Sequence, residues 1–445
     1  MHKLTNDNSR LTLLAALSLA LVSLVGCGDG LDRRNNSNDD SGGGGSISFN
    51  DDGPADASYV RLERLDYRSE KPSVISVLLQ AKDRDNTPVD SLTAADFDIR
   101  ENGDPLPQSE SASTLIERKF LPFHLDTVVL MDISSSISNT DLANMKQAVT
   151  ELVRDSATGQ SRLFAGQRVA LYTFDDSLTA VKTLSSSPAH IVAALDAIHL
   201  PIAITPTDLY GALRSAATLW ETSQTLAEIH DGAVVLITDG TDTAGRSSLS
   251  STLDALGDKK VFTIGVGEDA NEDVLSKLGT ANSYTVNSFD ELGPALADIR
   301  EKLRRYADSL YVLQYASPKR AAEGDADNSD HKFEIYVHGN KNSGNSGRVS
   351  GNFNSYEFSN VAPRVIIGGP DQLETGQTES YLADTFWAYN DPLYSWEISG
   401  SCELVSNEGP KVVISATASG SCQLSVTDTG HNAVSAAKAV SVRQD

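Results

Sequence analysis

Along residues 122–308 the spacing of apolar residues changes repeatedly from a strand pattern to a helix pattern. Residues 126–131 are almost continuously apolar, as buried parallel strands tend to be. Residues 141–155 follow, with apolar residues at the three- and four-residue spacing of a helix. The same alternation predicts strands at 168–174, 233–238 and 260–265 and helices at 188–198, 209–222, 271–278 and 289–306. This order indicates an α/β domain with a doubly wound, mostly parallel, Rossmann-like sheet.

The segments on both sides of this domain show strand patterns without helices. Residues 73–79 before it, and residues 311–315 and 333–337 after it, are rich in β-branched and aromatic residues or alternate between apolar and polar. We therefore expect residues 57–121 and 309–361 to form one β-sandwich into which the α/β domain is inserted.

Residues 362–445 consist of short strand patterns between Gly, Asp and Ser turns, which predicts a separate all-β domain. Trp396 and the turn at 427–430 resemble those of immunoglobulin-like or PKD-like repeats. Cys402 follows the tryptophan, whereas the first cysteine of an immunoglobulin domain precedes it. The resemblance implies a β-sandwich and leaves its subtype open.

The N-terminus has the pattern of an export signal. Within residues 1–26, a weakly basic start is followed by an apolar run, 11–25, that is too short for an ordinary membrane-spanning helix. The run leads into Leu-Val-Gly-Cys, ending at Cys27, which resembles a bacterial lipobox; an uncleaved signal anchor is the alternative. By resemblance to Gram-negative lipoproteins, Gly28 after a lipidated cysteine implies the outer membrane. Residues 27–56 are polar and glycine-rich, so we expect a disordered tether.

Charge and cysteine content narrow the classes of partner. The formal net charge of −25 argues against nucleic acid or an anionic membrane surface as the main partner. If Cys27 carries lipid, Cys402 and Cys422 remain as an even pair in an exported, oxidising compartment. We expect a disulfide between them, because no further Cys or His is near enough in sequence to complete a metal site convincingly.

One short motif carries the clearest chemistry. The strand at 126–131 leads directly into Asp132, Ser134 and Ser136, whose alternate spacing directs side chains to the same side of an extended segment. One carboxylate and two hydroxyls suit a hard divalent cation such as Mg²⁺, with Ca²⁺ or Mn²⁺ as alternatives. Two further polar residues, Thr207 and Asp239, follow in a loop before a predicted helix and at the end of a buried strand. Ligands of open α/β sheets bind at such strand ends.

These three motifs resemble, in order, the metal-ion-dependent adhesion site of von Willebrand factor type A domains. The resemblance covers about residues 122–308 and implies that Asp132, Ser134, Ser136, Thr207 and Asp239 hold the cation. Thr205 is a rival for the threonine, because the two glycines that often precede it in the family are missing; the spacing to the following helix favours Thr207. Alternatively, the serines cap the next helix and Asp239 belongs to an ordinary turn.

The function that this resemblance implies is binding and not catalysis. The chain contains no nucleophile elbow, zinc-protease motif or phosphate-binding loop, and His124 and His230 are expected at the surface or in loops. In the family, the ion accepts a Glu or Asp carboxylate from a protein partner. We therefore expect a lipid-anchored envelope protein that is not an enzyme. The alternatives are a structural component of envelope assembly and an accessory subunit of an enzyme complex.

Overall fold

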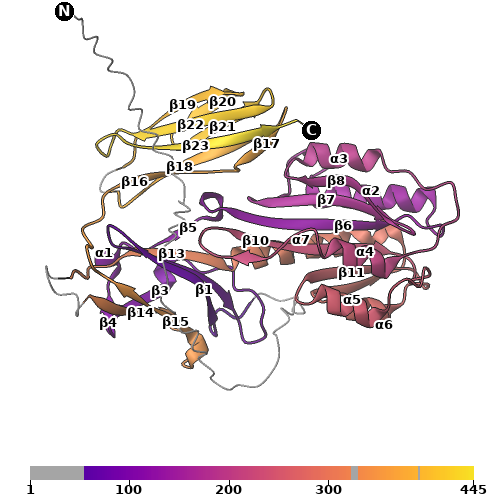
Figure 1. Ribbon diagram of the computed structural model, residues 1–445, viewed down its shortest axis with the longest axis horizontal. Coiled ribbons are helices and arrows are strands. Elements are labelled where there is room, and N and C mark those ends of the chain that lie inside the picture. Colours follow the sequence, from indigo (N-terminus) through magenta and orange to yellow (C-terminus); the bar gives the residue numbers. More distant parts are fainter. Residues whose placement is uncertain (1–54, 322–328, 389–390, 445) are drawn as a thin grey trace, which may run out of the picture. The chain divides into compact units, whose positions relative to one another are not determined.

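The computed structural model describes residues 55–321, 329–388 and 391–444 (Figure 1). These residues fall into two compact units, which divide between Ala362 and Pro363. The predicted signal peptide, Cys27 and nearly all of the tether lie outside the described residues. Among the residues that are described, none of the helices is both long enough and apolar enough to cross a membrane.

A seven-stranded sheet forms the centre of the first unit. Its strands run in the order β12-β11-β10-β6-β7-β8, and β9 pairs with β10. All neighbours are parallel except β8 and β9, which confirms the mostly parallel α/β sheet. The strands are β6 (Phe123–Asp132), β7 (Gln167–Phe174), β8 (Leu178–Ser185), β9 (Ser223–Gln224), β10 (Ile229–Thr238), β11 (Lys260–Val266) and β12 (Asn282–Val286). His124 and His230, expected at the surface or in loops, lie in β6 and β10 and are partly exposed.

Six helices accompany this sheet. They are α2 (Asn139–Val153), α3 (Pro188–Asp196), α4 (Leu209–Ala216), α5 (Leu249–Leu256), α6 (Glu272–Leu278) and α7 (Leu292–Asp308). Apolar side chains of α4, α5 and α6 share one core with β6, β10 and β11, while α2 packs with α3 and α7. Helix α4 ends earlier than the predicted 209–222. Thr218 Oγ1 donates to Ser215 O (2.8 Å), and the chain turns so that Trp220 is buried.

A β-sandwich is built from strands on both sides of the α/β domain. One sheet has the order β1-β2-β13-β5 and the other β15-β14-β3-β4, so strands from before and after the domain pair directly (indigo and orange in Figure 1). Apolar residues of both sheets share one core. The strands are β1 (Arg61–Glu70), β2 (Val74–Lys82), β3 (Phe97–Glu101), β4 (Asp104–Leu106), β5 (Thr114–Ile116), β13 (Leu310–Ala316), β14 (Asp330–Val337) and β15 (Arg348–Asn354), with the short helix α1 (Gln108–Ser111) before β5.

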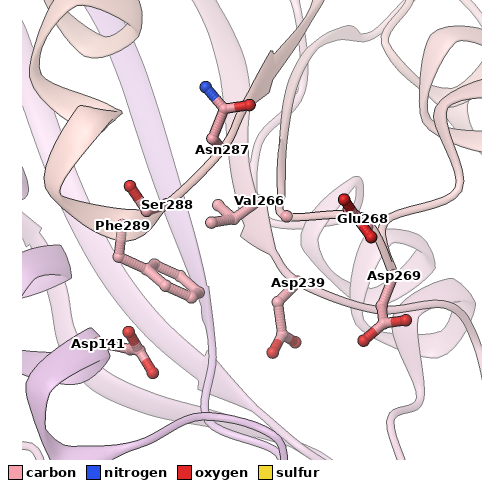
Figure 2. A pocket seen from close by; sticks show the side chains of 9 residues that line it. Asp141, Asp239, Val266, Glu268, Asp269, Asn287, Ser288 and Phe289 are labelled. Atoms are coloured by element: carbon pink, nitrogen blue, oxygen red, sulfur yellow. The ribbon is translucent and has the colours of Figure 1, made fainter.

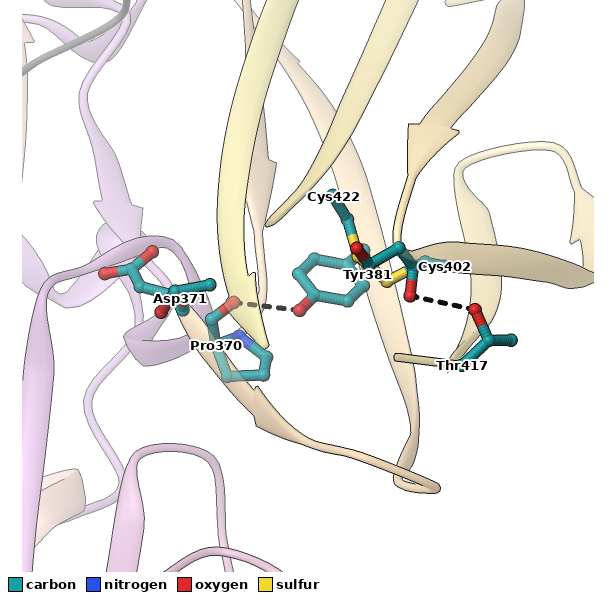
Figure 3. The surroundings of a disulfide bond; sticks show 8 residues. Pro370, Asp371, Tyr381, Cys402, Thr417 and Cys422 are labelled. Atoms are coloured by element: carbon teal, nitrogen blue, oxygen red, sulfur yellow. Dashed lines mark hydrogen bonds between the residues drawn. A yellow bond between two sulfur atoms is a disulfide. The ribbon is translucent and has the colours of Figure 1, made fainter. Parts of the chain in front are cut away.

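The second unit is all-β. Its two four-stranded sheets have the orders β16-β18-β21-β20 and β17-β23-β22-β19. The strands are β16 (Arg364–Gly368), β17 (Gln372–Glu374), β18 (Thr378–Phe386), β19 (Tyr394–Gly400), β20 (Cys402–Glu408), β21 (Lys411–Ala416), β22 (Gly420–Asp428) and β23 (Val434–Arg443). The predicted Cys402–Cys422 disulfide is confirmed, and it joins β20 to β22 and thus one sheet to the other (Figure 3). Beside it, the hydroxyl of the buried Tyr381 donates to Pro370 O (2.9 Å).

Candidate metal centre

The candidate centre lies where two adjacent parallel strands end. Strand β6 ends at Asp132, and β10 ends at Thr238, one residue before Asp239. Ile237 pairs with Met131 in the register of these strands, so their final residues leave the sheet side by side. Two motifs that are about a hundred residues apart in sequence therefore meet at one edge of the sheet.

Asp132 is the most deeply buried residue of this centre, with 0% of its surface exposed. Its Oδ1 accepts a hydrogen bond from the Ser134 N–H (2.9 Å), and its Oδ2 accepts one from Thr238 Oγ1 (2.6 Å). Burial raises the pKa of Asp132 from 3.8 to about 6, although these hydrogen bonds oppose the shift; the charge of nearby Asp239 adds to it. No Lys, Arg or His of the described residues forms an ion pair with this carboxylate.

The two serines connect Asp132 to Asp239. Ser134 Oγ lies 3.3 Å from Ser136 Oγ, and Ser136 Oγ donates to Asp239 Oδ1 (2.9 Å). Neither serine caps the following helix, because Ser138 is the N-cap of α2 and accepts a hydrogen bond from the Asp141 N–H (3.2 Å). The hydroxyls of Ser134 and Ser136 therefore remain at the strand edge, beside the two carboxylates.

Thr207 is held on the neighbouring loop by its backbone. Its N–H donates to Thr243 Oγ1 (2.8 Å), and its carbonyl accepts from the N–H groups of Thr243 and Ala244. The next residue, Asp208, caps α4 by accepting from the Gly211 N–H (3.0 Å). A Cβ at Gly211 would lie 2.3 Å from the Asp208 carboxylate, so this cap needs glycine there. Thr207 is thus fixed to the segment that follows Asp239.

Thr205, the rival threonine, lies on the same loop. Its carbonyl accepts a hydrogen bond from Ser135 Oγ (3.4 Å), and its own Oγ1 is buried without a hydrogen-bond partner. The loop that contains both threonines therefore touches the Asp132–Ser136 segment.

Comparison with known proteins identifies the domain that contains this centre. The family model of the von Willebrand factor type A domain matches residues 126–302. Residues 126–302 form a type A domain.

Solved structures provide more distant comparisons. Proximal thread matrix protein 1 from the mussel byssus is 23% identical over 46% of this chain and 49% of that chain, with a TM-score of 0.33. Another structure of that mussel protein has zinc in its metal-ion-dependent adhesion site (MIDAS) motif. BatB from Bacteroides thetaiotaomicron is 17% identical over 41% of this chain and 98% of that chain, with a TM-score of 0.34. This chain spans about half the length of the mussel protein.

An acidic cavity adjoins the type A centre on the Asp239 side. The cavity, of about 240 Å³, is open to solvent, and four carboxylates line it: Asp141, Asp239, Glu268 and Asp269. Figure 2 shows Asp239 with Asp141 and Asp269 on either side. Burial raises the pKa of Asp239, and the charges of Asp141 and Asp269 add to the shift, while the hydrogen bond from Ser136 opposes it.

Sequence analysis did not single out several residues around this centre. Thr238, whose hydroxyl holds Asp132, stands directly before Asp239, and Glu268 and Asp269 come just after β11. Their signal was the same as for the predicted ligands: polar residues at the carboxyl end of a buried parallel strand. Asp141 does not follow a strand. It belongs to the capping box of α2, so its sequence pattern indicated the start of a helix.

The side chains at this edge fit a hard divalent cation. Asp132, Ser134, Ser136 and Asp239 offer only oxygen atoms, and hydrogen-bond contacts connect each to the next. Mg²⁺ prefers six oxygen ligands, including waters, and two carboxylates would balance its charge. Thr207 would add a third hydroxyl from its loop. Burial raises the pKa of both carboxylates, and a bound cation would oppose that shift by supplying a positive charge.

Proposed function

We propose that this chain is a lipid-anchored protein of the bacterial cell envelope that binds a protein partner through a divalent cation. The cation is Mg²⁺, held by Asp132, Ser134, Ser136, Thr207 and Asp239. When bound, the ion offers one coordination position to a carboxylate of the partner. The chain performs no catalysis, and its β-domains act as spacer and support between the type A domain and the membrane.

One observation carries the cation part of this proposal. Asp132 is fully buried at the end of β6, yet the partners that the described residues give it are an amide N–H and the hydroxyls of Thr238 and Ser134, none of which is positively charged. Burying a carboxylate without a positive partner costs several kcal/mol of folding free energy, and this cost is also what raises its pKa. A divalent cation beside Asp132 would remove that cost and would use the hydroxyls that already lie next to it.

Thermal unfolding of the full chain in Mg²⁺ and in chelator tests the metal site. At a hundred times the dissociation constant, a ligand adds about 2.7 kcal/mol, or about 5–10 °C in Tm for a domain of this size. We expect this shift in the parent and in Asp258→Asn, an exposed aspartate away from the centre. Asp132→Asn and Asp239→Asn should lose it. Equal shifts in all four proteins would overturn the metal assignment.

Capture from envelope extract separates binding from metal-dependent stability. The parent should retain a protein that elutes with chelator, and Asp239→Asn should not retain it. A partner that stays bound in chelator, although the Tm of the parent responds to Mg²⁺, would favour a permanent structural assembly. The interaction proposal would then be wrong, while the metal site would stand.

A further inference from the structure

Two isoleucines on the loop before Thr207 are fully exposed. The relative exposures of Ile202 and Ile204 are 107% and 90%, whereas other large apolar residues of the described ranges reach at most 63%. Both lie in the irregular segment between α3 and α4. A neighbouring pair of bare isoleucines forgoes the stabilisation that burial gives, so it indicates a surface that a partner covers.

Hydrogen bonds place this loop beside the metal centre. Ser135 Oγ donates to Thr205 O (3.4 Å), which ties the loop to the Asp132–Ser136 segment. Three residues of fully extended chain span about 11 Å at most, so the Cα of Ile204 lies within that distance of the Thr207 Cα. A protein that brings a carboxylate to the metal therefore also reaches Ile204.

Prolines restrict the segment that presents the isoleucines. Pro201 precedes them, and Pro206 follows Thr205. Proline fixes its own φ and limits the residue before it to extended conformations, which lowers the number of states that the free loop can populate. A loop that is already restricted loses less entropy when a partner orders it, so its apolar contacts add more to affinity.

The cavity next to Asp239 gives the centre a second neighbour of different character. This cavity is lined by the carboxylates of Asp141, Glu268 and Asp269. Additional acidic residues of a partner would be repelled on that side, and Lys or Arg would be attracted. The centre thus has an apolar loop and an acidic cavity as neighbours.

We propose that Ile202 and Ile204 form the apolar half of the docking surface around the metal, and that they select the protein partner. Resting on the proposed function, this proposal assigns the partner a three-part surface: an apolar region against the isoleucines, an Asp or Glu at the metal, and a Lys or Arg toward the Asp239 side. The isoleucines are specificity-determining contacts and do not hold the ion.

A library of twelve-residue peptides displayed on phage is the probe for this proposal. It is panned on the immobilised full chain in Mg²⁺ and eluted with EDTA. We expect the eluted peptides to share an acidic residue with apolar residues on one side and Lys or Arg on the other. A library that yields no EDTA-eluted peptides, or only peptides without apolar residues, would overturn the proposal.

The selected peptide is then titrated against three proteins. Ile202→Ser/Ile204→Ser should bind it at least tenfold more weakly than the parent, because burial of one isoleucine is worth about a factor of ten. Leu404→Ser/Val405→Ser is the matched control, since it removes two exposed apolar residues from β20. It should bind within about twofold of the parent. All three proteins should keep the Mg²⁺ shift in Tm, which shows that they are folded and bind the ion.

The outcomes distinguish this proposal from the proposed function. Binding that is sensitive to EDTA but indifferent to the isoleucine substitutions overturns only the role of the loop. Binding that resists EDTA overturns the link to the metal and with it the proposed function. If the isoleucines instead mediate binding to neutral phosphatidylcholine vesicles and no peptide binds, the loop recognises lipid and the assignment of a protein partner is wrong.

Discussion

The two edges of the central sheet treat buried carboxylates in opposite ways. Near the start of β6, Asp126 is 1% exposed and accepts two hydrogen bonds from the Arg168 guanidinium (2.7 and 2.9 Å). His230 Nε2 lies 2.7 Å from the same carboxylate. At the far end of the same strand, Asp132 is as deeply buried, and no positive partner for it lies within residues 55–321, 329–388 and 391–444.

Strand β10 repeats this contrast. Near its start, Asp231 is 2% exposed, and Lys260 Nζ donates to its carboxylate (2.6 Å). Just after its end, Asp239 has a serine hydroxyl as its side-chain partner and other carboxylates nearby. Within one sheet, Arg168 and Lys260 pair with the buried carboxylates at one edge, whereas no Lys, Arg or His of the described residues forms an ion pair with Asp132 or Asp239 at the other. The edge at which the carboxylates lack a positive partner is also the edge that offers hydroxyl ligands. An ion from solution would therefore bind there.

The largest expected effect on stability comes from removing a positively charged side chain at the edge where the buried carboxylates are paired. Lys260→Met would leave the buried Asp231 without its positive partner, and breaking a buried pair in this way costs about 3–5 kcal/mol. Urea unfolding of the full chain should show that loss in the transition of the type A domain. Lys277→Met, which makes the same change at an exposed position of α6, should change the free energy of unfolding by less than about 0.5 kcal/mol.

A small loss in Lys260→Met, comparable with that of Lys277→Met, would contradict the contrast between the edges. Asp231 would then not depend on its positive partner. The double variant Lys260→Met/Asp231→Asn provides a further check, because it removes both charges and should recover part of the stability that Lys260→Met loses.

At the other edge, where Asp132 lies, we expect a substitution to raise the free energy of unfolding. In chelator at pH 8, Asp132→Asn should stabilise the protein, because it removes a buried charge and keeps an oxygen that can accept from the Ser134 N–H. A folded-state pKa of about 6, against 3.8, corresponds to a gain of about 3 kcal/mol. Destabilisation of the metal-free protein by Asp132→Asn would show that the charge at this edge is already compensated.

The same group predicts a pH dependence. Because the folded-state pKa of Asp132 is raised, the folded protein takes up a proton as the pH falls through 6, whereas the unfolded chain does so near 3.8. Its unfavourable contribution is therefore present at pH 8 and disappears between pH 6 and pH 4. The advantage of Asp132→Asn over the parent in chelator should shrink over that window by about 1.4 kcal/mol per pH unit. A difference that does not change with pH would exclude Asp132 as its source.

Residue patterns predicted polar side chains at the carboxyl ends of buried strands, because parallel strands end at a common edge. Asp132 and Asp239 each follow an apolar run, which places both at the ends of buried strands. Their grouping into one site came from the resemblance to the type A domain, and the structure brings them together because β6 and β10 are neighbours. The positive partners at the other edge were not predictable in this way. Lys260 meets Asp231 because β10 and β11 are neighbours, and strand order is a tertiary property that local patterns do not contain. The exposure of Ile202 and Ile204 was equally hidden, since the sequence does not show whether an apolar loop residue packs against the rest of the fold.

The smallest expected effect concerns a cation that does lie at the metal edge. The Arg246 side chain is 52% exposed, and its Nη1 and Nη2 approach Asp208 (3.4 Å) and Asp176 (3.6 Å). Exposed pairs of this kind contribute about 0–1 kcal/mol, because water and salt screen them. Arg246→Gln should therefore change the free energy of unfolding by less than about 1 kcal/mol and leave the Mg²⁺ shift in Tm intact. If the variant instead lost more than about 2 kcal/mol in chelator, a value typical of a broken buried pair, Arg246 would be the counter-charge of this edge. The contrast between the two edges would then be wrong, and the carboxylates at the metal edge would not need an ion from solution.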